Sequence, residues 1–468
     1  EYKNAWLKIY DKPVVYFPIF FHPDPSVQRQ SGFLLPTISN SNVNGIGFQL
    51  PYYKVIADNK DLTFSPRMYS DNNILFQTEY RQANKSSDFI TDFSFNRKDG
   101  NTKTHLFSNL SGSKDDFDYR INLESVSNNN YLKVNNIKSP IINDINTLNS
   151  YVIFEKFAKT ISFEGSFEVI EDLTKNDSDK YEYIFPNYRF TNNMNNYFEF
   201  SSSGYQKQYN TNVNEINIIN DIIYKNDTHI SSNGFVNNIT TLIRNVNSDA
   251  DDSTRYKNGT DNKLLGSIFF DTSIPMRKNN DIFEPKFSLR YSPNKTKNYK
   301  NLDNMIDYNS IFSLDRFSQN DMVENDFALT IGAEYIKRDK NKNDLLNFAI
   351  ANNIRVSKDD DLPKYQNFNK KRSDLIGKLN FKPSKYFDLG YDFSLDSNLK
   401  HSNYNLVKTI FSLNNFVTSF EFLEEDNNIG EKSFVKNTSV LQIDKQNFLT
   451  FKTNKDIDKD LTEYYNLI

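Results

Sequence analysis

The chain contains no cysteine, only four histidines and a single tryptophan among its 468 residues. The absence of cysteine excludes disulfides and thiolate chemistry within this stretch. The histidines, which are His22, His105, His229 and His401, are far apart in sequence, so no metal site built on clustered histidine is predicted. The formal net charge of −4 gives no electrostatic footprint for nucleic acid.

Long apolar runs are also missing, and no window approaches the roughly 18 residues of a membrane-spanning helix. The N-terminus has no signal-peptide pattern, but Glu1 opens in mid-pattern, so we expect the chain to be part of a longer protein. The sequence contains no G-x-S-x-G elbow, no H-E-x-x-H motif and no Walker loop. We therefore predict no catalytic residue, no cofactor and no metal.

Aromatic residues are abundant, with 40 Phe and 28 Tyr, and they alternate with polar residues. In the stretch DYRINLES, Tyr119, Ile121 and Leu123 share one parity while Arg120 and Asn122 share the other. The same period of two, typical of β-strands, recurs in four further stretches, residues 151–170, 286–293, 327–336 and 387–396. Turn-forming clusters around Gly100 and Gly259 separate such runs. The pattern predicts an all-β chain of many strands.

Two architectures fit alternating strands. In a soluble sandwich, the apolar parity packs against a second sheet. In an outer-membrane barrel, the apolar parity faces lipid and the polar parity faces a wet interior. The ring-rich parity, the charged opposite parity and the long polar loops favour a large antiparallel transmembrane β-barrel.

Several motifs near the N-terminus together resemble the LptD family of outer-membrane lipopolysaccharide-assembly proteins. They are P-x-F-x-HPDP (residues 18–25), SGFLLP (31–36), LPYY (50–53), the D-x-T-x-x-P spacing (61–66) and EYR (79–81). Weaker similarity continues at residues 283–293, 309–324 and 373–398. In the second of these, Gln319 stands where the family pattern has glycine, and Met322 where a basic residue is common. Between about residues 102 and 282, only the alternation is recognisable.

The resemblance implies a domain organisation. Residues 1–30 would be the last strands of a periplasmic β-jellyroll, and residues 31–468 an outer-membrane barrel whose closing strand lies beyond Ile468. The joint between them would comprise Pro18, His22, Pro23, Asp24, Pro25 and Arg29. The implied function is insertion of lipopolysaccharide into the outer leaflet, with an LptE-like plug lipoprotein and an LptA-like periplasmic bridge as partners. A passive porin and a soluble β-sandwich adhesin are the alternatives.

The resemblance also implies a lateral gate at Pro36 and Pro51, which are the last residues of the expected strands FLLP and GFQLP. Proline lacks a backbone donor, so a seam that contains it has fewer hydrogen bonds to break. The simpler interpretation is that both prolines merely end strands. The substrate path beside the gate would include Phe33, Leu34, Gly47 and Phe48.

Other polar residues have simpler interpretations. The pair His22 and Asp24 is expected to be a structural turn between prolines. The acidic group Asp249, Asp251 and Asp252 could bind a divalent cation, but such loop clusters are usually solvated. Arg29 is expected to face water, with contact to a phosphorylated glycolipid as the alternative.

Overall fold

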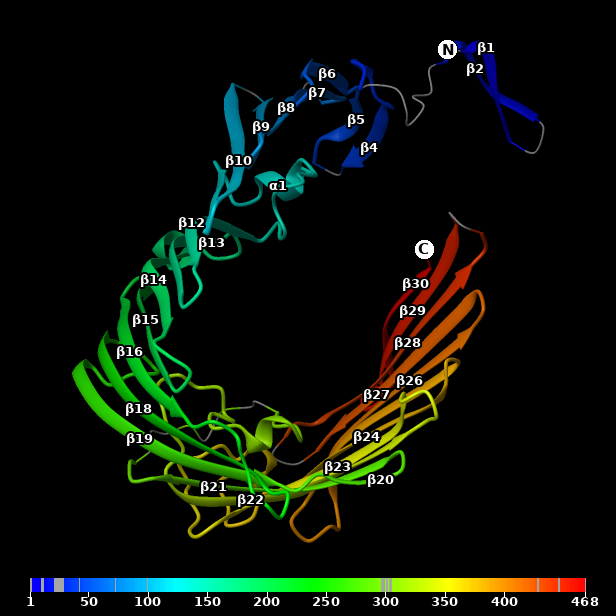
Figure 1. Ribbon diagram of the computed structural model, residues 1–468. Coiled ribbons are helices and arrows are strands. Elements are labelled where there is room, and N and C mark those ends of the chain that lie inside the picture. Colours follow the sequence, from blue (N-terminus) through cyan, green and yellow to red (C-terminus); the bar gives the residue numbers. More distant parts are fainter. Residues whose placement is uncertain are drawn as a thin grey trace. The chain divides into compact units, whose positions relative to one another are not determined.

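The structure is a computed structural model that describes residues 2–9, 12–20, 29–41, 43–71, 73–98, 100–295, 299, 302, 305–426, 429–444 and 447–467 (Figure 1). The chain forms two compact units. The first comprises residues 1–157, 164–186 and 207–213, and the second comprises residues 158–163, 187–206 and 214–468.

Nearly all of the regular structure is β. In the first half of the chain the strands are β1 (Tyr2–Ile9), β2 (Lys12–Phe20), β3 (Gly32–Phe33), β4 (Thr37–Ser41), β5 (Gly45–Gln49), β6 (Tyr52–Ala57), β7 (Lys60–Tyr69), β8 (Ile74–Ala83), β9 (Ser87–Lys98), β10 (Asn101–Lys114), β11 (Phe117–Val126), β12 (Thr147–Phe157), β13 (Ile161–Asp172), β14 (Tyr181–Asn193) and β15 (Phe198–Tyr209). They are followed by β16 (Val213–Lys225), β17 (His229–Ile230), β18 (Val236–Asp251), β19 (Gly259–Ser273), β20 (Met276–Lys278), β21 (Asp281–Ser292), β22 (Asp326–Arg338), β23 (Asp344–Arg355), β24 (Leu375–Ser384), β25 (Phe387–Leu395), β26 (Ser402–Leu413), β27 (Phe416–Glu425), β28 (Lys432–Gln442), β29 (Phe448–Asp456) and β30 (Leu461–Leu467). The short helices are α1 (Tyr131–Val134), η1 (Asp177–Lys180), η2 (Ser310–Phe312) and η3 (Tyr365–Asn367).

Strands β3–β30 belong to one antiparallel sheet, and β1 and β2 pair only with each other among the described strands. The predicted fold class, an all-β antiparallel β-barrel, is confirmed. Within the described residues, no helix is long and apolar enough to cross a membrane. The domain boundary at residue 30 stays a prediction.

The two faces of the strands have opposite polarity, and the polar face is the buried one. On β9, the rings of Phe93 and Phe95 are exposed, while Asp92 and Ser94 between them are buried. The strands β11 and β16 repeat this, with Ile121, Leu123, Ile216 and Ile218 exposed and Asn122, Glu124, Glu215 and Asn217 buried. A soluble sandwich buries its apolar face instead. The observed polarity is that of a sheet with apolar solvent outside and polar groups inside.

Two connecting segments pack on the polar face and contribute buried apolar side chains to the cores of the two units. The N-terminal inner segment (residues 127–146) contains α1, which is labelled in Figure 1. It packs Tyr131 and Leu132 against Phe107 in the first unit. The C-terminal inner segment (residues 305–325), which contains η2, packs Ile311 and Phe317 in the second unit. Each unit therefore has its apolar core between the sheet and an inner segment.

Candidate functional site

The two predicted gate prolines lie in interruptions of neighbouring strands. Pro36 lies between β3, which has only two residues, and β4, while Pro51 lies between β5 and β6. The strands β3 and β4 pair with β6 and β5, and both β5 and β6 pair with β7. Each proline thus interrupts what would otherwise be one continuous strand, and the gate role itself stays a prediction.

A third proline belongs to the same row. Gln49 pairs with Arg67 and Tyr52 pairs with Phe64, so Leu50 and Pro51 face Pro66 and Ser65 on β7. Leu50 N donates to Pro66 O at 3.3 Å, and Leu34 N donates to Pro51 O at 2.9 Å. The three prolines are not direct partners, because Pro51 faces Ser65 and Pro66 faces Leu50, but they lie within about one residue of one another along neighbouring strands. We call Pro36, Pro51 and Pro66 the proline row.

The backbone geometry shows which hydrogen bonds the proline row lacks. Residues of a hydrogen-bonded antiparallel pair exchange two bonds. Because proline has no N–H, the bonds that would return from Pro51 to Leu34 O and from Pro66 to Leu50 O cannot form. Leu50 directs its N–H to β7. The register changes by one residue between the β3–β6 and β4–β5 pairings, so Leu34, Leu35 and Pro36 face only Leu50 and Pro51, and the regular alternation is interrupted at Pro36.

The predicted path residues lie on different faces. Phe33 is 72% exposed, with its ring 5.1 Å from that of Tyr52, and Leu34 and Phe48 are also exposed. Gly47 is buried on the polar face, where an added Cβ would lie 2.9 Å from Ser39 Oγ. Phe33, Leu34 and Phe48 are therefore exposed, whereas Gly47 is buried.

The joint residues are only partly described. Pro18 lies within β2, while His22, Pro23, Asp24 and Pro25 lie outside the described residues. Arg29 Nη1 is 2.6 Å from Asp61 Oδ2, and Nη2 donates to Asp58 O at 3.0 Å. The Arg29 side chain, although 56% exposed, is thus attached to the start of β7.

A polar cleft of about 400 Å³ lies beside Pro51, between strands β4–β8 and the N-terminal inner segment. Its lining consists of Thr37, Ile38, Ser39, Gln49, Pro51, Thr63, Ser65, Arg67, Gln77, Glu79, Asn136 and Lys138. Arg67, which is 8% exposed, donates to Gln49 Oε1 at 2.8 and 3.1 Å, to Asn135 O at 2.5 Å and to the Tyr69 hydroxyl at 3.2 Å. We call this space the gate cleft.

A serine, a histidine and an aspartate meet on the polar face, an arrangement that the sequence analysis missed. Ser94 and His105 face each other across β9 and β10, with Ser94 Oγ 2.6 Å from His105 Nδ1. Asp92 Oδ1 lies 3.5 Å from His105 Nε2, and the Tyr131 hydroxyl lies 2.7 Å from Ser94 Oγ. Ser94 and Asp92 are fully buried under α1, so the group holds the N-terminal inner segment in place and is closed to a substrate.

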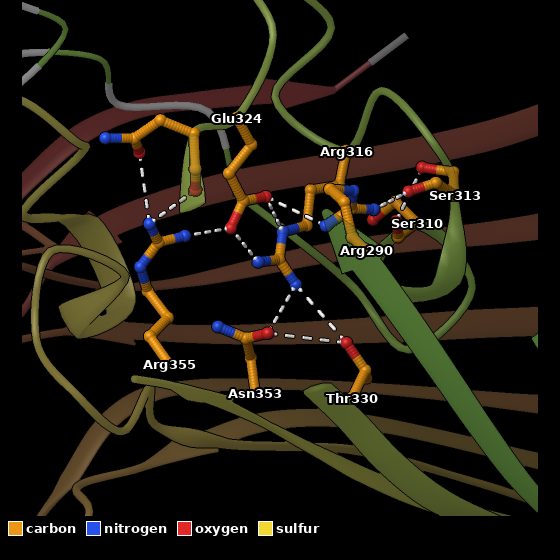
Figure 2. Close-up of polar contacts among 9 residues, drawn as sticks. Arg290, Ser310, Ser313, Arg316, Glu324, Thr330, Asn353 and Arg355 are labelled. Carbon is orange, nitrogen blue, oxygen red and sulfur yellow. Dashed lines mark hydrogen bonds and ion pairs between the residues drawn. The ribbon is translucent and has the colours of Figure 1, made fainter. Parts of the chain in front are cut away.

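Glu324 is surrounded by three arginines in the second unit, as Figure 2 shows. Its carboxylate binds Arg316 of the same inner segment, Arg290 of β21 at 2.8 Å and Arg355 of β23. Burial by itself raises the pKa of Glu324, but the three guanidinium groups lower it from 4.5 to about 2. We call these four residues the Glu324 cluster, and it attaches the C-terminal inner segment to the sheet.

The two departures from the family pattern take part in a second attachment of this segment. Arg244 of β18 donates from Nη1 to Gln319 O at 3.1 Å and to Met322 O at 2.7 Å. Its other nitrogens bind both oxygens of Asp221. Since Gln319 and Met322 contribute main-chain oxygens, these contacts do not depend on the identity of their side chains.

Asp249 and Asp251 lie at the end of β18, and Asp252 directly follows it. Across the described part of the chain, no group of three or more His, Asp or Glu side chains is arranged to hold a metal ion. The solvated interpretation of Asp249, Asp251 and Asp252 stays a prediction.

Comparison with known proteins gives a consistent set of relatives. The family model of LptD, described as LPS transport system D, matches residues 107–450, a range that follows the proline row. An LPS-assembly protein LptD from Pseudoalteromonas translucida is 25% identical over 399 residues, which cover 79% of this chain and 52% of that protein. One from Shewanella denitrificans is 34% identical over 138 residues, covering 28% of this chain and 18% of the relative. This chain thus spans about half the length of the first of these relatives.

Among solved structures, the siderophore receptor PiuA from Acinetobacter baumannii is similar with a TM-score of 0.34. The two sequences are 7% identical, and the match covers 91% of this chain and 77% of that chain.

Proposed function

This chain belongs to the LptD family of outer-membrane β-barrel proteins, and on that premise we propose that it inserts lipopolysaccharide into the outer leaflet through a lateral opening at the proline row. The observation that carries the proposal is the loss of backbone donors at one level of adjacent strands, at Pro51 and Pro66. The proposed step is transport, with no chemical conversion of the lipid.

The polarity of the two faces supports an amphiphilic substrate. Lipopolysaccharide has acyl chains that avoid water and a saccharide that avoids lipid. The exposed face carries rings such as Phe33 and Phe48, and the opposite face is polar and borders the gate cleft. A sheet that parts at the proline row would let the saccharide leave the polar side while the acyl chains enter lipid.

The cost of such an opening is reduced where donors are absent. Each net hydrogen bond contributes about 0.5–1.5 kcal/mol, so each missing one lowers the work of separation by that amount. Pro36 also contributes no N–H to its strand, and the family resemblance places the seam between the first and last barrel strands beside that strand. By the same resemblance, we propose an LptE-like lipoprotein as plug and an LptA-like protein as periplasmic bridge.

Site-specific photo-crosslinking in cells tests this function. A photoreactive residue is placed at Phe33, Leu34 or Phe48 of the full-length protein. The matched control position is Phe348 of β23, which is 38% exposed on a strand of the second unit. Lipopolysaccharide adducts at the gate positions that require ongoing transport, without adducts at Phe348, are expected. Their absence from a folded barrel would refute the gate and favour a passive channel.

A further inference from the structure

The gate cleft contains a buried positive charge that has no carboxylate partner among the described residues. Every hydrogen bond of Arg67 described above goes to a neutral oxygen, from Gln49, Asn135 and Tyr69. No ion pair of Arg67 occurs among the residues that the structure describes. A buried cation is costly unless it is paired or fully hydrogen-bonded, so this position favours an anion.

The other charges of the gate cleft strengthen this preference. Lys138 of the N-terminal inner segment lines the same space, is exposed, and forms no ion pair within the described ranges. The carboxylate in the lining, Glu79, lies 3.3 Å from Arg81 Nε and is already partnered. Arg67 and Lys138 are therefore the two cations of the lining that have no ion pair among the described residues.

The size and position of the gate cleft define the ligand class. About 400 Å³ is enough for one or two sugar rings, and the remaining lining is rich in Ser, Thr, Gln and Asn, which hydrogen-bond saccharide hydroxyls. Planar guanidinium and ammonium groups are the usual phosphate ligands in proteins. We propose that the gate cleft binds a phosphorylated part of the saccharide, with Arg67 and Lys138 as phosphate ligands.

This assignment rests on the proposed function, since the saccharide would be that of the transported lipopolysaccharide. The cleft holds the saccharide at the level of the proline row, directly behind Pro51. Binding there places the phosphorylated sugar beside the strands that open, and release follows when these strands part.

The test uses the full-length protein in detergent, with a photoreactive residue at Ser39 in the cleft lining. It compares lipopolysaccharide with the same preparation after enzymatic dephosphorylation. Charge-assisted hydrogen bonds should make the adduct yield with the phosphorylated form about tenfold higher. This preference should fall to about one in R67Q/K138Q and be largely retained in R67K, which keeps the charge.

The matched control is Arg120→Gln. Arg120 has the polar parity of β11, but its guanidinium is paired with Glu155 Oε1 at 3.0 Å, and neither residue lines the gate cleft. R120Q should keep the wild-type preference. Equal yields from both forms in the wild type, or an unchanged preference in R67Q/K138Q, would overturn the assignment.

A second probe separates this proposal from the proposed function. If adducts at Phe33 persist while Ser39 shows no phosphate preference, the phosphate site is wrong and the gate stands. If adducts are lost at both positions in a barrel that retains its heat-modifiable mobility, the lipopolysaccharide transport proposal fails as well.

Discussion

Restoring the missing donors of the proline row should make the proposed gate harder to open. The substitutions Pro51→Ala and Pro66→Ala each supply an N–H opposite a carbonyl oxygen that is already in place, Leu34 O and Leu50 O respectively. Each new bond should add about 0.5–1.5 kcal/mol to the free energy of strand separation, which lowers the opening equilibrium about two- to tenfold. The double variant should lower it by roughly the product of the two effects.

Two assays measure this effect at different levels. Hydrogen exchange of peptides from β3–β7, followed by mass spectrometry, reports the opening equilibrium. Delivery of lipopolysaccharide to the cell surface reports function. Pro285→Ala is the matched control, because Pro285 lies within β21, in the second unit, and its carbonyl accepts from Ile274 N at 3.2 Å. It should leave both gate exchange and delivery unchanged.

The reasoning would be refuted by P51A/P66A exchanging and delivering like the wild type. Slower exchange with normal delivery would show that the bonds form but that release takes place elsewhere.

The inner segments supply three further predictions. Glu324→Gln leaves three guanidinium groups without their anion, which should lower the free energy of unfolding by about 3–5 kcal/mol. Residues 305–325 should then become accessible to limited proteolysis. The control Asp344→Asn, which affects an ion pair at the sheet margin, should cause neither change. Because the folded pKa of Glu324 is lowered from 4.5 to about 2, its contribution to stability is complete above pH 4.5 and is lost as the pH falls towards 2. As the pH is lowered from 4.5 to 2, the thermal midpoint of the wild type should therefore decrease, and that of E324Q should decrease less. Ser94→Ala removes the partner of Tyr131 and should lower the thermal midpoint by the equivalent of about 1–3 kcal/mol, while delivery by the protein that remains folded is retained.

The fold was largely predictable because the two-residue alternation of side chains along a strand can be read directly from the sequence. Residues 119–123 lie on β11 with the parity predicted, and the stretches 286–293, 327–336 and 387–396 lie on or largely within β21, β22 and β25. The alternating stretch at 151–170 covers two strands, β12 and β13. The alternation of apolar and polar residues continues through the turn between these two strands, so the period alone did not reveal the turn.

The site was less predictable because its contacts depend on register and on chain reversal. Pro66 belongs to the proline row only because Gln49 pairs with Arg67, a register that no local pattern specifies. Ser94 and His105 likewise meet only across two strands. The even spacing of prolines at 36, 51 and 66 was the available signal for the row. For the Glu324 cluster, whose members come from an inner segment and two strands, no comparable signal exists.

The missing N–H of Pro36 has a consequence for how the protein is made. An exposed strand edge is a template on which another chain can add a strand, and unpaired N–H groups are half of that template. Pro36 has no N–H and lies between β3 and β4, whose partners among the described strands are β6 and β5, so this strand offers one donor fewer to an added chain. Before the barrel is assembled, this edge is therefore a poorer partner for aggregation. The residue proposed to ease opening in the membrane would also protect the unassembled chain in transit.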